Sequence, residues 1–505
     1  MASDAPHNHR QSTALDADTE QLRHMGYEQE LSRRMGGFSS FAVSFARICV
    51  LAGGITAFSV ALGAGGGFAL GVGWPIGCLF ALIVAAAISQ IASAYPTAGG
   101  VYHWGAILGG KGWGWATAWF NLFGVVFALA SINFGLYEVF FKAPLGTLLG
   151  ADTSAWGWGV QTAFIVIVTA LQAWLNHAAP RLTTLLTDLS GGLIFFLTVL
   201  LITALLWYSP SVDFSRAFMF ENFTGAPGST WPESDNLAIV FLLGLLLTLY
   251  TICGYEGAAN AAEETHDAQR AVPRGILGAV LWSSLFGYGL VVTFVAVMPS
   301  VEGGVSLGMG VFDAILAPLP TALRVFLLLG LFYVNFVCAL AAMTSASRMI
   351  YAFARDGGLP WSGQLQRVSA TCRTPMIAVW ACALMAIVAT LYGDAFVVLS
   401  TASAVFLYIS YVMPTAAGLL AEGRSWVHKG PLDLGALSKP VAALAVLGGA
   451  ILIFVGAQPP NEKVLYVTIA LVVILNLSWW CGVRARFAGP PTMTHEFALR
   501  GQAAS

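Results

Sequence analysis

The chain has 505 residues, of which 57% are hydrophobic and only 10% are charged. Soluble domains carry about 25% charged residues, so this composition excludes an ordinary soluble protein and indicates a lipid environment. The net charge of −2 gives no reason to expect a nucleic-acid partner, and none of the seven cysteines forms a CxxC pair, so we expect no disulfide framework, no metal site and no cofactor.

Residues 1–35 form a polar tail with no hydrophobic run before Phe38. We therefore expect no cleavable signal peptide, and the first span must itself direct insertion. Because a helix needs about 20 apolar residues to cross the hydrocarbon core, the sequence predicts an all-α polytopic membrane protein. Its twelve transmembrane helices begin near residues 38, 72, 112, 158, 184, 235, 273, 321, 375, 395, 439 and 463. The stretch 375–420 could hold a different number of spans.

The distribution of basic residues orients these spans. With the N-terminus in the cytoplasm, 18 of the 23 lysines and arginines fall on the cytoplasmic side. Four fall outside: Lys142, Arg216, Arg324 and Lys463. Loops on the cytoplasmic side of membrane proteins carry an excess of positive charge. The asymmetry therefore predicts a multi-pass protein of the cell membrane with both termini in the cytoplasm.

Glycine interrupts two of the spans. The first contains Ala52, Gly53, Gly54 and Ile55, followed by Gly63 to Gly67, and the sixth contains Cys253, Gly254, Tyr255, Glu256 and Gly257. Interruptions at corresponding positions of two halves point to a midplane binding site, because unwound backbone exposes N–H and C=O groups to a solute. The alternative is that these glycines only let helices pack closely.

The two interrupted spans divide the chain into units. They begin two five-helix segments, residues 36–208 and 235–420, which we expect to form inverted repeats. Two further helices within 437–485 and a cytoplasmic tail, 486–505, complete the chain.

Two charged residues lie deep inside predicted spans. Arg47 lies nine residues beyond Phe38, roughly 13 Å along a helix at 1.5 Å per residue, and Glu256 lies in the sixth-span interruption. Buried charges in membranes face the bundle interior and find partners. Glu256 could attract a substrate ammonium group or take up a coupling proton, and Arg47 could contact a substrate carboxylate or replace a coupling cation. The alternative is that they form a structural pair with each other.

Other side chains are candidates for the same pocket. Tyr255 could act as a lid or as a cation–π partner for an amine, and Asn121, Phe123 and Phe127 of the third span could line the site. Aromatic residues are common in membrane helices, so packing is the competing interpretation for each of them.

A cytoplasmic gate is predicted below the sixth-span interruption. Glu263 and Glu264 follow it by roughly 10 Å of helix and could pair with Arg348 or Arg355. A cluster that only fixes helix ends is the alternative. His103 and His177 lie near cytoplasmic loop ends, where a proton role is conceivable but is not our first interpretation.

Three segments resemble a known family. They are Ser89 to Tyr102 (SQIASAYPTAGGVY), Glu263 to Ile276 (EETHDAQRAVPRGI) and Ser347 to Pro360 (SRMIYAFARDGGLP). The first is similar to the second-span signature of the amino acid–polyamine–organocation permeases. The other two resemble their amino acid/choline transporter branch. The resemblance covers about residues 30–485 and implies a leucine-transporter-like fold, with 5+5 inverted repeats plus two peripheral helices, and alternating access.

The resemblance also suggests how transport could be coupled. Ala341, Thr344 and Ser345 resemble the eighth-span half of a sodium site, whose other half would be carbonyls near Ile48 and Leu51. The charge of Arg47 weakens this sodium hypothesis, and the fifth span has no lysine for the proton-coupled alternative. In the resemblance, Gln90 and Glu256 stand where many relatives carry Glu and Asp, and Arg47 occupies a usually apolar position.

Other functions fit less well. An enzyme would need a catalytic motif, and HExxH, GxSxG and GxxxxGK[ST] are all missing from the sequence. A channel would show filter loops or charged rings. The sequence therefore predicts a secondary transporter for amino acids or related amines such as γ-aminobutyrate, with a proton or sodium as possible coupling ion. Choline or a polyamine is the alternative substrate. A choline site would need an aromatic cage, however, and a polyamine site would need more than one carboxylate.

Overall fold

We describe the protein from a computed structural model. The structure describes residues 18–491 apart from 145, 147–149, 151, 154–155, 392–395, 428 and 460. Within these residues the secondary structure is helical, and the only β pairing is two isolated bridges. The ends of the two predicted tails, residues 1–17 and 492–505, and the predicted start at residue 395 lie outside the described residues.

Ten helical segments of the described chain are long and apolar enough to cross a membrane. They are Gly37–Thr56 (α2, Gly37–Ile48, and α3, Val50–Thr56), Gly73–Ala94 (α5), Lys111–Lys142 (α7, Lys111–Tyr137, and a π-helical turn), Trp158–Ala178 (α9), Pro180–Tyr208 (α10), Ala268–Val297 (α13), Thr321–Arg355 (α16), Phe396–Ala421 (α19), Gly435–Gly456 (ending in α20, Ser438–Gly456) and Glu462–Arg486 (beginning with α21, Glu462–Ser478, and ending with α22, Arg484–Arg486).

Shorter helices complete the described chain. Three are apolar: α4 (Phe58–Gly71), α11 (Leu237–Thr251) and α18 (Met376–Thr390). The others are α6 (Val101–Gly109), α12 (Gly257–Asn260), α14 (Val301–Ser306), α15 (Val311–Leu316) and α17 (Ser362–Leu365). Helices begin within five residues of every predicted span start that the structure describes. Because α11 and α18 are short, the count of twelve membrane-crossing helices stays a prediction.

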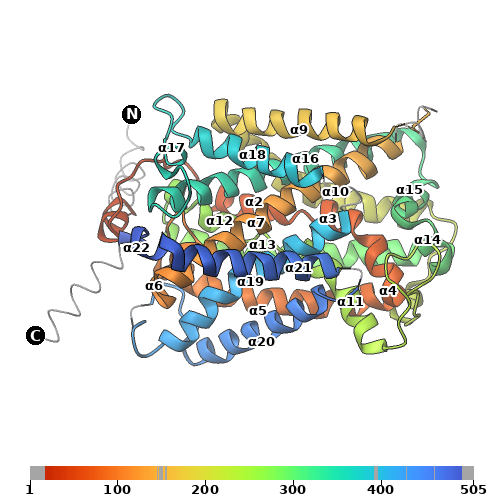
Figure 1. Ribbon diagram of the computed structural model, residues 1–505. Helices are drawn as coiled ribbons and strands as arrows, with labels where there is room; N and C mark the ends of the chain where they lie inside the picture. The colour runs from red at the N-terminus through yellow and green to blue at the C-terminus, as the bar shows by residue number, and fades with distance from the viewer. Residues whose placement is uncertain are drawn as a thin grey trace, which may run out of the picture.

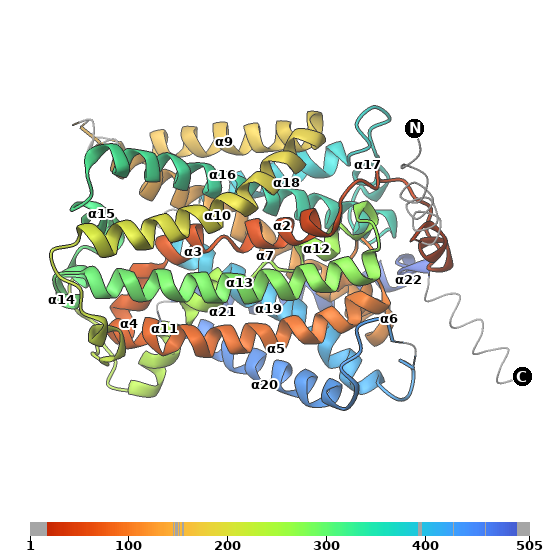
Figure 2. The same ribbon diagram turned by 180° about the vertical axis from the view of Figure 1, so that it is seen from behind.

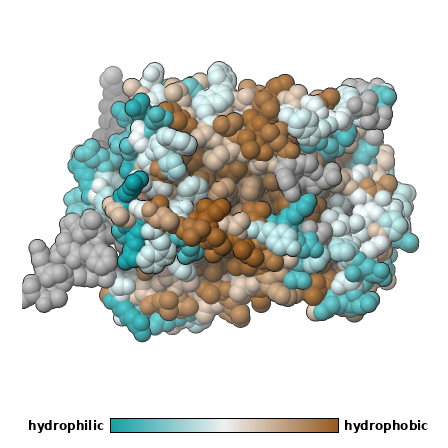
Figure 3. Space-filling view, viewed as in Figure 1, coloured by the Kyte–Doolittle hydropathy of each residue, from teal (hydrophilic) through white to brown (hydrophobic). Residues whose placement is uncertain are grey.

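The long helices run side by side along one axis (Figure 1). The first described residues and α22 lie at the same end of this bundle, at the left of Figure 1. From behind, α10, α13 and α5 lie next to one another (Figure 2). An apolar band crosses the middle of the surface, and hydrophilic residues gather toward both ends of the helices (Figure 3). A bundle with an apolar girdle across its helices is the arrangement that a bilayer demands, so the predicted all-α polytopic membrane class is confirmed.

The first span is interrupted between α2 and α3, before the Ala52–Gly54 segment, and Gly65 and Gly66 of the following glycine run have non-helical backbone inside α4. The break lies at Cys49, whose left-handed backbone (φ 34°) separates α2 from α3. Ala52, Gly53 and Gly54 are helical, one turn later. A Cβ on Gly53 would lie 2.9 Å from Thr251 Oγ1 and 3.0 Å from Thr251 Cα, so this glycine permits close packing of α3 against the end of α11. The predicted interruption at Ala52–Gly54 was wrong, since these residues are helical, whereas the Gly63–Gly67 run is interrupted at Gly65 and Gly66.

The sixth span is interrupted as predicted. Helix α11 ends at Thr251, residues 252–256 leave the helix, and α12 begins at Gly257. Gly254 has a positive φ of 86°, which an L-residue rarely adopts, and a Cβ there would lie 2.9 Å from Arg47 Nε. Gly254 thus lets the unwound sixth span approach the side chain at the end of α2.

Candidate substrate site

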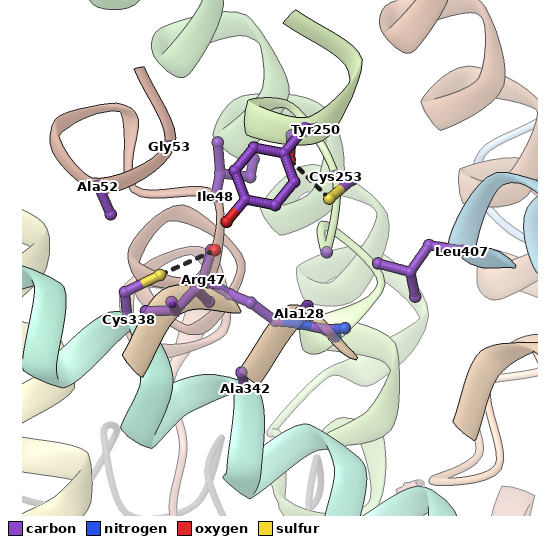
Figure 4. A pocket seen from close by; sticks show the side chains of 12 residues that line it. Arg47, Ile48, Ala52, Gly53, Ala128, Tyr250, Cys253, Cys338, Ala342 and Leu407 are labelled. Atoms are coloured by element: carbon purple, nitrogen blue, oxygen red, sulfur yellow. Dashed lines mark hydrogen bonds between the residues drawn. The ribbon is translucent and has the colours of Figure 1, made fainter. Parts of the chain in front are cut away.

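The two breaks meet around a small buried cavity (Figure 4). The space open to the centre of a water molecule is about 20 Å³, and one water needs roughly 10–15 Å³. The cavity is therefore smaller than any amino acid. It is lined by Arg47, Ile48, Ala52, Gly53, Ala128, Ile132, Tyr250, Cys253, Gly254, Cys338, Ala342 and Leu407.

Arg47 and Glu256 form an ion pair beside this cavity. Arg47 Nη2 lies 2.7 Å from Glu256 Oε1, and the two side chains are 2% and 0% exposed. The predicted partnership is thus present in the structure. In Figure 4 the side chain of Arg47 extends past the cavity toward Ala128, with its nitrogens at the far end. Two charges taken out of water must stay paired, because either one alone would carry a large desolvation penalty.

Tyr411 of α19 ties this pair to the unwound backbone. Its hydroxyl donates a short hydrogen bond to Glu256 Oε2 and accepts one of 3.0 Å from the Gly254 N–H. Asn121 Nδ2 lies 3.5 Å from Glu256 Oε1, at the limit of hydrogen bonding. The carboxylate is therefore held by groups from three other elements.

Ser44 of α2 hydrogen-bonds the backbone on both sides of Gly257, at the end of the sixth-span break. Its hydroxyl donates to the Tyr255 carbonyl at 2.6 Å and accepts from the Ala258 N–H at 3.0 Å. Two peptide groups freed by the unwinding are satisfied in this way. Helices α2 and α12 are therefore joined through one side chain.

Several buried polar atoms at the site have no hydrogen-bond partner among the described residues. They are Arg47 Nη1, the Tyr255 hydroxyl and Asn121 Oδ1. Buried polar groups in folded proteins are almost always hydrogen-bonded, so a cluster of unsatisfied ones calls for an explanation. Of these three residues Arg47 lines the cavity, where its guanidinium group can donate to a polar solute.

The predicted pocket residues divide into two groups. Arg47, Ala52, Gly53, Cys253 and Gly254 line the cavity, whereas Gly54, Ile55 and Tyr255 are buried beside it. The Tyr255 ring packs against Tyr411 with centroids 4.8 Å apart. The binding role of each residue stays a prediction.

The third-span aromatics do not reach the cavity. Phe123 packs against Trp119 and Phe127, and Phe127 packs against Phe406. The third span reaches the cavity instead through Ala128 and Ile132, one and five residues beyond Phe127 on α7. Phe123 and Phe127 are therefore packing residues in this conformation.

The residues of the possible sodium site lie on α16 and near the first-span break, and their role in ion binding stays a prediction. Thr344 Oγ1 donates to Asn176 Oδ1 of α9 at 2.6 Å and to the Leu340 carbonyl at 3.0 Å. Ser345 Oγ instead lies near Gly257. Ala341 is buried, while Ile48, Cys338 and Ala342 line the cavity.

The predicted gate pairs are formed. Glu263 Oε1 lies 3.0 Å from Arg355 Nη2, and Glu264 Oε1 lies 2.9 Å from Arg348 Nε. Burial alone would raise the pKa of Glu263, but the charge and hydrogen bonds of Arg355, with the Ala98 amide, hold that pKa below its usual range. The carboxylate is thus charged at neutral pH, and its pair with Arg355 joins α16 to the chain below α12.

The segment before α2 reinforces the gate. The amides of Arg34 and Met35 both donate to the Glu264 carbonyl, at 2.9 and 2.8 Å. The ring of Tyr27 lies 3.9 Å from the Arg355 guanidinium carbon. Part of the predicted polar tail is therefore packed against the bundle.

The two histidines have different surroundings. His103 Nε2 lies 3.1 Å from Asp356 Oδ2, whose carboxylate also accepts from the hydroxyls of Tyr27 and Tyr102. His177 lies at the surface end of α9, with Nδ1 3.5 Å from Trp380 Nε1. Only His103 belongs to the polar network below the gate.

Sequence reasoning missed several residues that α16 and α19 contribute to the site. Tyr411 is the most important, and Cys338, Ala342 and Leu407 were missed with it. The only available signal was Tyr408 and Tyr411, three residues apart and so on one face of a predicted helix. Tyr408 donates to the Ile252 carbonyl at 2.9 Å, so both hydroxyls serve the sixth-span break.

Long apolar helices, an apolar girdle and a charged site buried between two interrupted spans define a multi-pass α-helical membrane protein with a central polar site. The chain belongs to the amino acid permease family, which matches residues 35–479. Members of this family are transporters rather than enzymes. The expected likeness to the amino acid–polyamine–organocation superfamily is thereby confirmed.

Individual relatives cover nearly the whole chain. The chain is 32% identical to amino-acid permease BAT1 of Arabidopsis thaliana, over 94% of its own length and 96% of that protein. It is 29% identical to the BAT1 homolog of Oryza sativa subsp. japonica, with the same coverage. It is also 29% identical to amino-acid permease 2 of Neurospora crassa, over 95% of this chain and 90% of that one.

Proposed function

We propose that this protein is a secondary transporter that carries amino acids, or related zwitterions such as γ-aminobutyrate, across the cell membrane by alternating access. The observation that carries the proposal is the meeting of two interrupted spans at a buried Arg47–Glu256 pair beside a small cavity. The names of the relatives point to the same substrate class.

The ion pair explains why a zwitterion is favoured. A substrate with a carboxylate and an ammonium group can insert between Arg47 and Glu256, so that one internal ion pair is exchanged for two to the ligand. Each protein charge stays compensated throughout, which avoids the penalty of an isolated buried charge. Choline supplies only a cation and would leave Arg47 without a partner. A polyamine also lacks a carboxylate for Arg47.

Access to this site requires movement. The cavity is too small for an amino acid, so the described conformation is closed. At the end of the bundle where the first described residues and α22 lie, the Glu263–Arg355 and Glu264–Arg348 pairs hold the helices together. At the opposite end Trp231 Nε1 donates to the Val60 carbonyl at 2.7 Å. Alternating access would break the contacts at one end of the bundle while those at the other end remain.

The membrane arrangement belongs to the same proposal. We infer twelve spans with both termini in the cytoplasm, two inverted five-helix repeats (36–208 and 235–420) and two peripheral helices within 437–485. In this arrangement Arg47 supplies a fixed positive charge near the first-span break. A proton or sodium remains the candidate coupling ion.

Transport by purified protein tests the proposal. Proteoliposomes would be given labelled neutral amino acids, γ-aminobutyrate, choline and a polyamine, with sodium and proton gradients imposed separately. We expect saturable uptake of one or more zwitterions and acceleration by substrate preloaded on the opposite side. Currents far above carrier turnover would identify a channel instead. Uptake of choline or polyamine alone would overturn the zwitterion assignment.

A further inference from the structure

A second cavity lies at the end of the bundle where both described termini are found. Its volume is about 630 Å³, within the roughly 300–1,000 Å³ typical of small-molecule sites. It lies between the segment before α2, the α9–α10 turn and the loop before α18. Its lining is Ser32, Arg34, Ala178, Ala179, Pro180, Arg181, Leu182, Thr371, Cys372 and Arg373.

This cavity, which we call the arginine pocket, is strongly basic. Three of its lining residues are arginines, and none is acidic. Arg34 is paired with Glu264 at 3.3 Å, but the guanidinium groups of Arg181 and Arg373 have no acidic partner among the described residues. The pocket therefore carries two uncompensated positive charges.

The backbone of the pocket adds to its preference for an anion. The 29-residue helix α10 begins here at Pro180, and the N-terminus of a long helix carries partial positive charge. Arg373 has a positive φ of 51°, an uncommon and strained conformation for a side-chain-bearing residue. The loop thus holds Arg373 at the pocket at a conformational cost, and retained strain of this kind is common at binding sites.

The pocket continues into an apolar surface. Leu182 lines it, and Leu185 and Leu189 lie exposed further along α10. Trp174 of α9 and Trp380 of α18 are exposed near the same boundary, and tryptophans favour the headgroup level of a bilayer. A ligand that fills this site has a negative head with apolar chains attached.

We propose that the arginine pocket binds the headgroup of an anionic phospholipid from the adjacent membrane leaflet. Arg181 and Arg373 contact the phosphate, and the acyl chains lie along Leu182, Leu185 and Leu189 of α10. Basic pockets between membrane helices recognise such headgroups. The continuous apolar face favours a lipid over free phosphate. This inference is independent of the transported substrate.

Cys372 supplies a direct probe, because its thiol lies in the pocket and is partly exposed. Cys481 is exposed outside the pocket and serves as an internal reference. The full-length protein would be placed in nanodiscs of phosphatidylcholine alone or with phosphatidylglycerol. The rate of alkylation by uncharged N-ethylmaleimide would be measured at both cysteines. We expect Cys372, relative to Cys481, to react about tenfold more slowly with phosphatidylglycerol, as for a site about nine-tenths occupied.

Two double variants separate the pocket from general surface charge. Arg181→Gln with Arg373→Gln should abolish the protection. Arg274→Gln with Arg424→Gln removes two exposed arginines from the same end of the bundle and should preserve it. Equal protection of both double variants, or equal loss in both, would overturn the proposal.

The wild-type protein alone also gives a decisive result, even if a variant fails to fold. Phosphatidylcholine discs with added inorganic phosphate should leave Cys372 reactive. Protection by free phosphate as strong as that by phosphatidylglycerol would show a soluble-anion site instead. Equal Cys372 reactivity in the two membranes would also overturn the proposal.

Discussion

Arg47 and Glu256 compensate each other's buried charge. Each is almost fully buried, and the 2.7 Å contact neutralises both. Removing one partner from a buried pair typically costs about 3–5 kcal/mol, because the other charge is left uncompensated. The same property makes the pair a receptor for a zwitterion, since a ligand must satisfy both charges if it separates them.

Neutralising one member should therefore damage both stability and transport. For Glu256→Gln we expect a loss of about 3 kcal/mol in stability and of zwitterion uptake. Thermal unfolding in detergent and proteoliposome uptake would measure the two effects. Near-normal uptake by Glu256→Gln would remove this carboxylate from the mechanism.

The double variant Arg47→Gln with Glu256→Gln separates binding from architecture. It leaves no isolated buried charge, so we expect much of the stability to return, with a coupling energy on the order of 1–3 kcal/mol. Uptake should not return with it. Recovery of both would mean that the pair is purely structural.

Tyr411 positions the carboxylate. Tyr411→Phe removes the donor to Glu256 and the acceptor for the Gly254 amide. We expect an apparent affinity for substrate about tenfold lower, since an unsatisfied buried group costs about 1–3 kcal/mol. Tyr408→Phe is the matched control, because that hydroxyl donates to the Ile252 carbonyl at the same break rather than to Glu256. Equal affinity losses in the two variants would argue against a positioning role.

At the scale of elements, the two breaks differ in cause. In the sixth span, Gly254 supplies a positive φ directly. In the first, Cys49 adopts the left-handed conformation, while Gly53 stays helical and packs on Thr251. Gly254 therefore marks an unwound site, whereas Gly53 marks a close helix contact.

Adjacent glycines of α3 test this distinction. Gly53→Ala forces a Cβ to within 3.0 Å of the Thr251 backbone, so we expect a loss of about 1–3 kcal/mol from overpacking. Gly54→Ala is the control, because its nearest neighbour would be a Trp74 ring carbon at 4.0 Å. Unfolding temperatures should fall for the first variant only. Equal tolerance of both would contradict the packing assignment.

The gate pairs join α16 to the segment after α12, and the two must separate if the bundle opens at the end where the termini lie. Arg348 and Glu264 are both 4% exposed, so their pair is much less screened than a surface pair. We expect Arg348→Ala and Glu264→Ala to change the transport rate more than the apparent affinity, as measured by initial uptake over a substrate series. Arg270→Ala breaks an exposed pair at the same end, 58% and 55% exposed, and should change neither. Loss of affinity alone would count against a gate.

At the scale of the molecule, the apolar girdle requires the helix axes to cross the bilayer. Because the first described residues and α22 lie at one end, tags at both termini should face the same compartment. An epitope inserted after Asp235, in the exposed approach to α11, should face the other. Antibody labelling of intact and permeabilised cells distinguishes these outcomes. Termini on opposite sides would overturn the membrane arrangement.

Hydropathy and charge along the chain were enough to predict the helical membrane class, the start of each described span and the sixth-span interruption. These properties depend on local composition, because lipid forces each long apolar segment to satisfy its own backbone as a helix. The pairing of Arg47 with Glu256 was also foreseeable, since few charges lie within the spans and each needs a partner.

Tertiary packing alone decided the role of Gly53, the role of Tyr411 and the direction of Thr344. Each depends on what a neighbouring helix presents: Thr251 against Gly53, Gly254 against Tyr411, and Asn176 against Thr344. The arginine pocket likewise joins residues from three distant segments. Composition and periodicity determine where a helix forms and whether it can span the membrane. The contacts between helices determine which polar groups meet. The physical reason is that a buried polar group needs a hydrogen-bond partner, and only the tertiary structure decides which group is within reach.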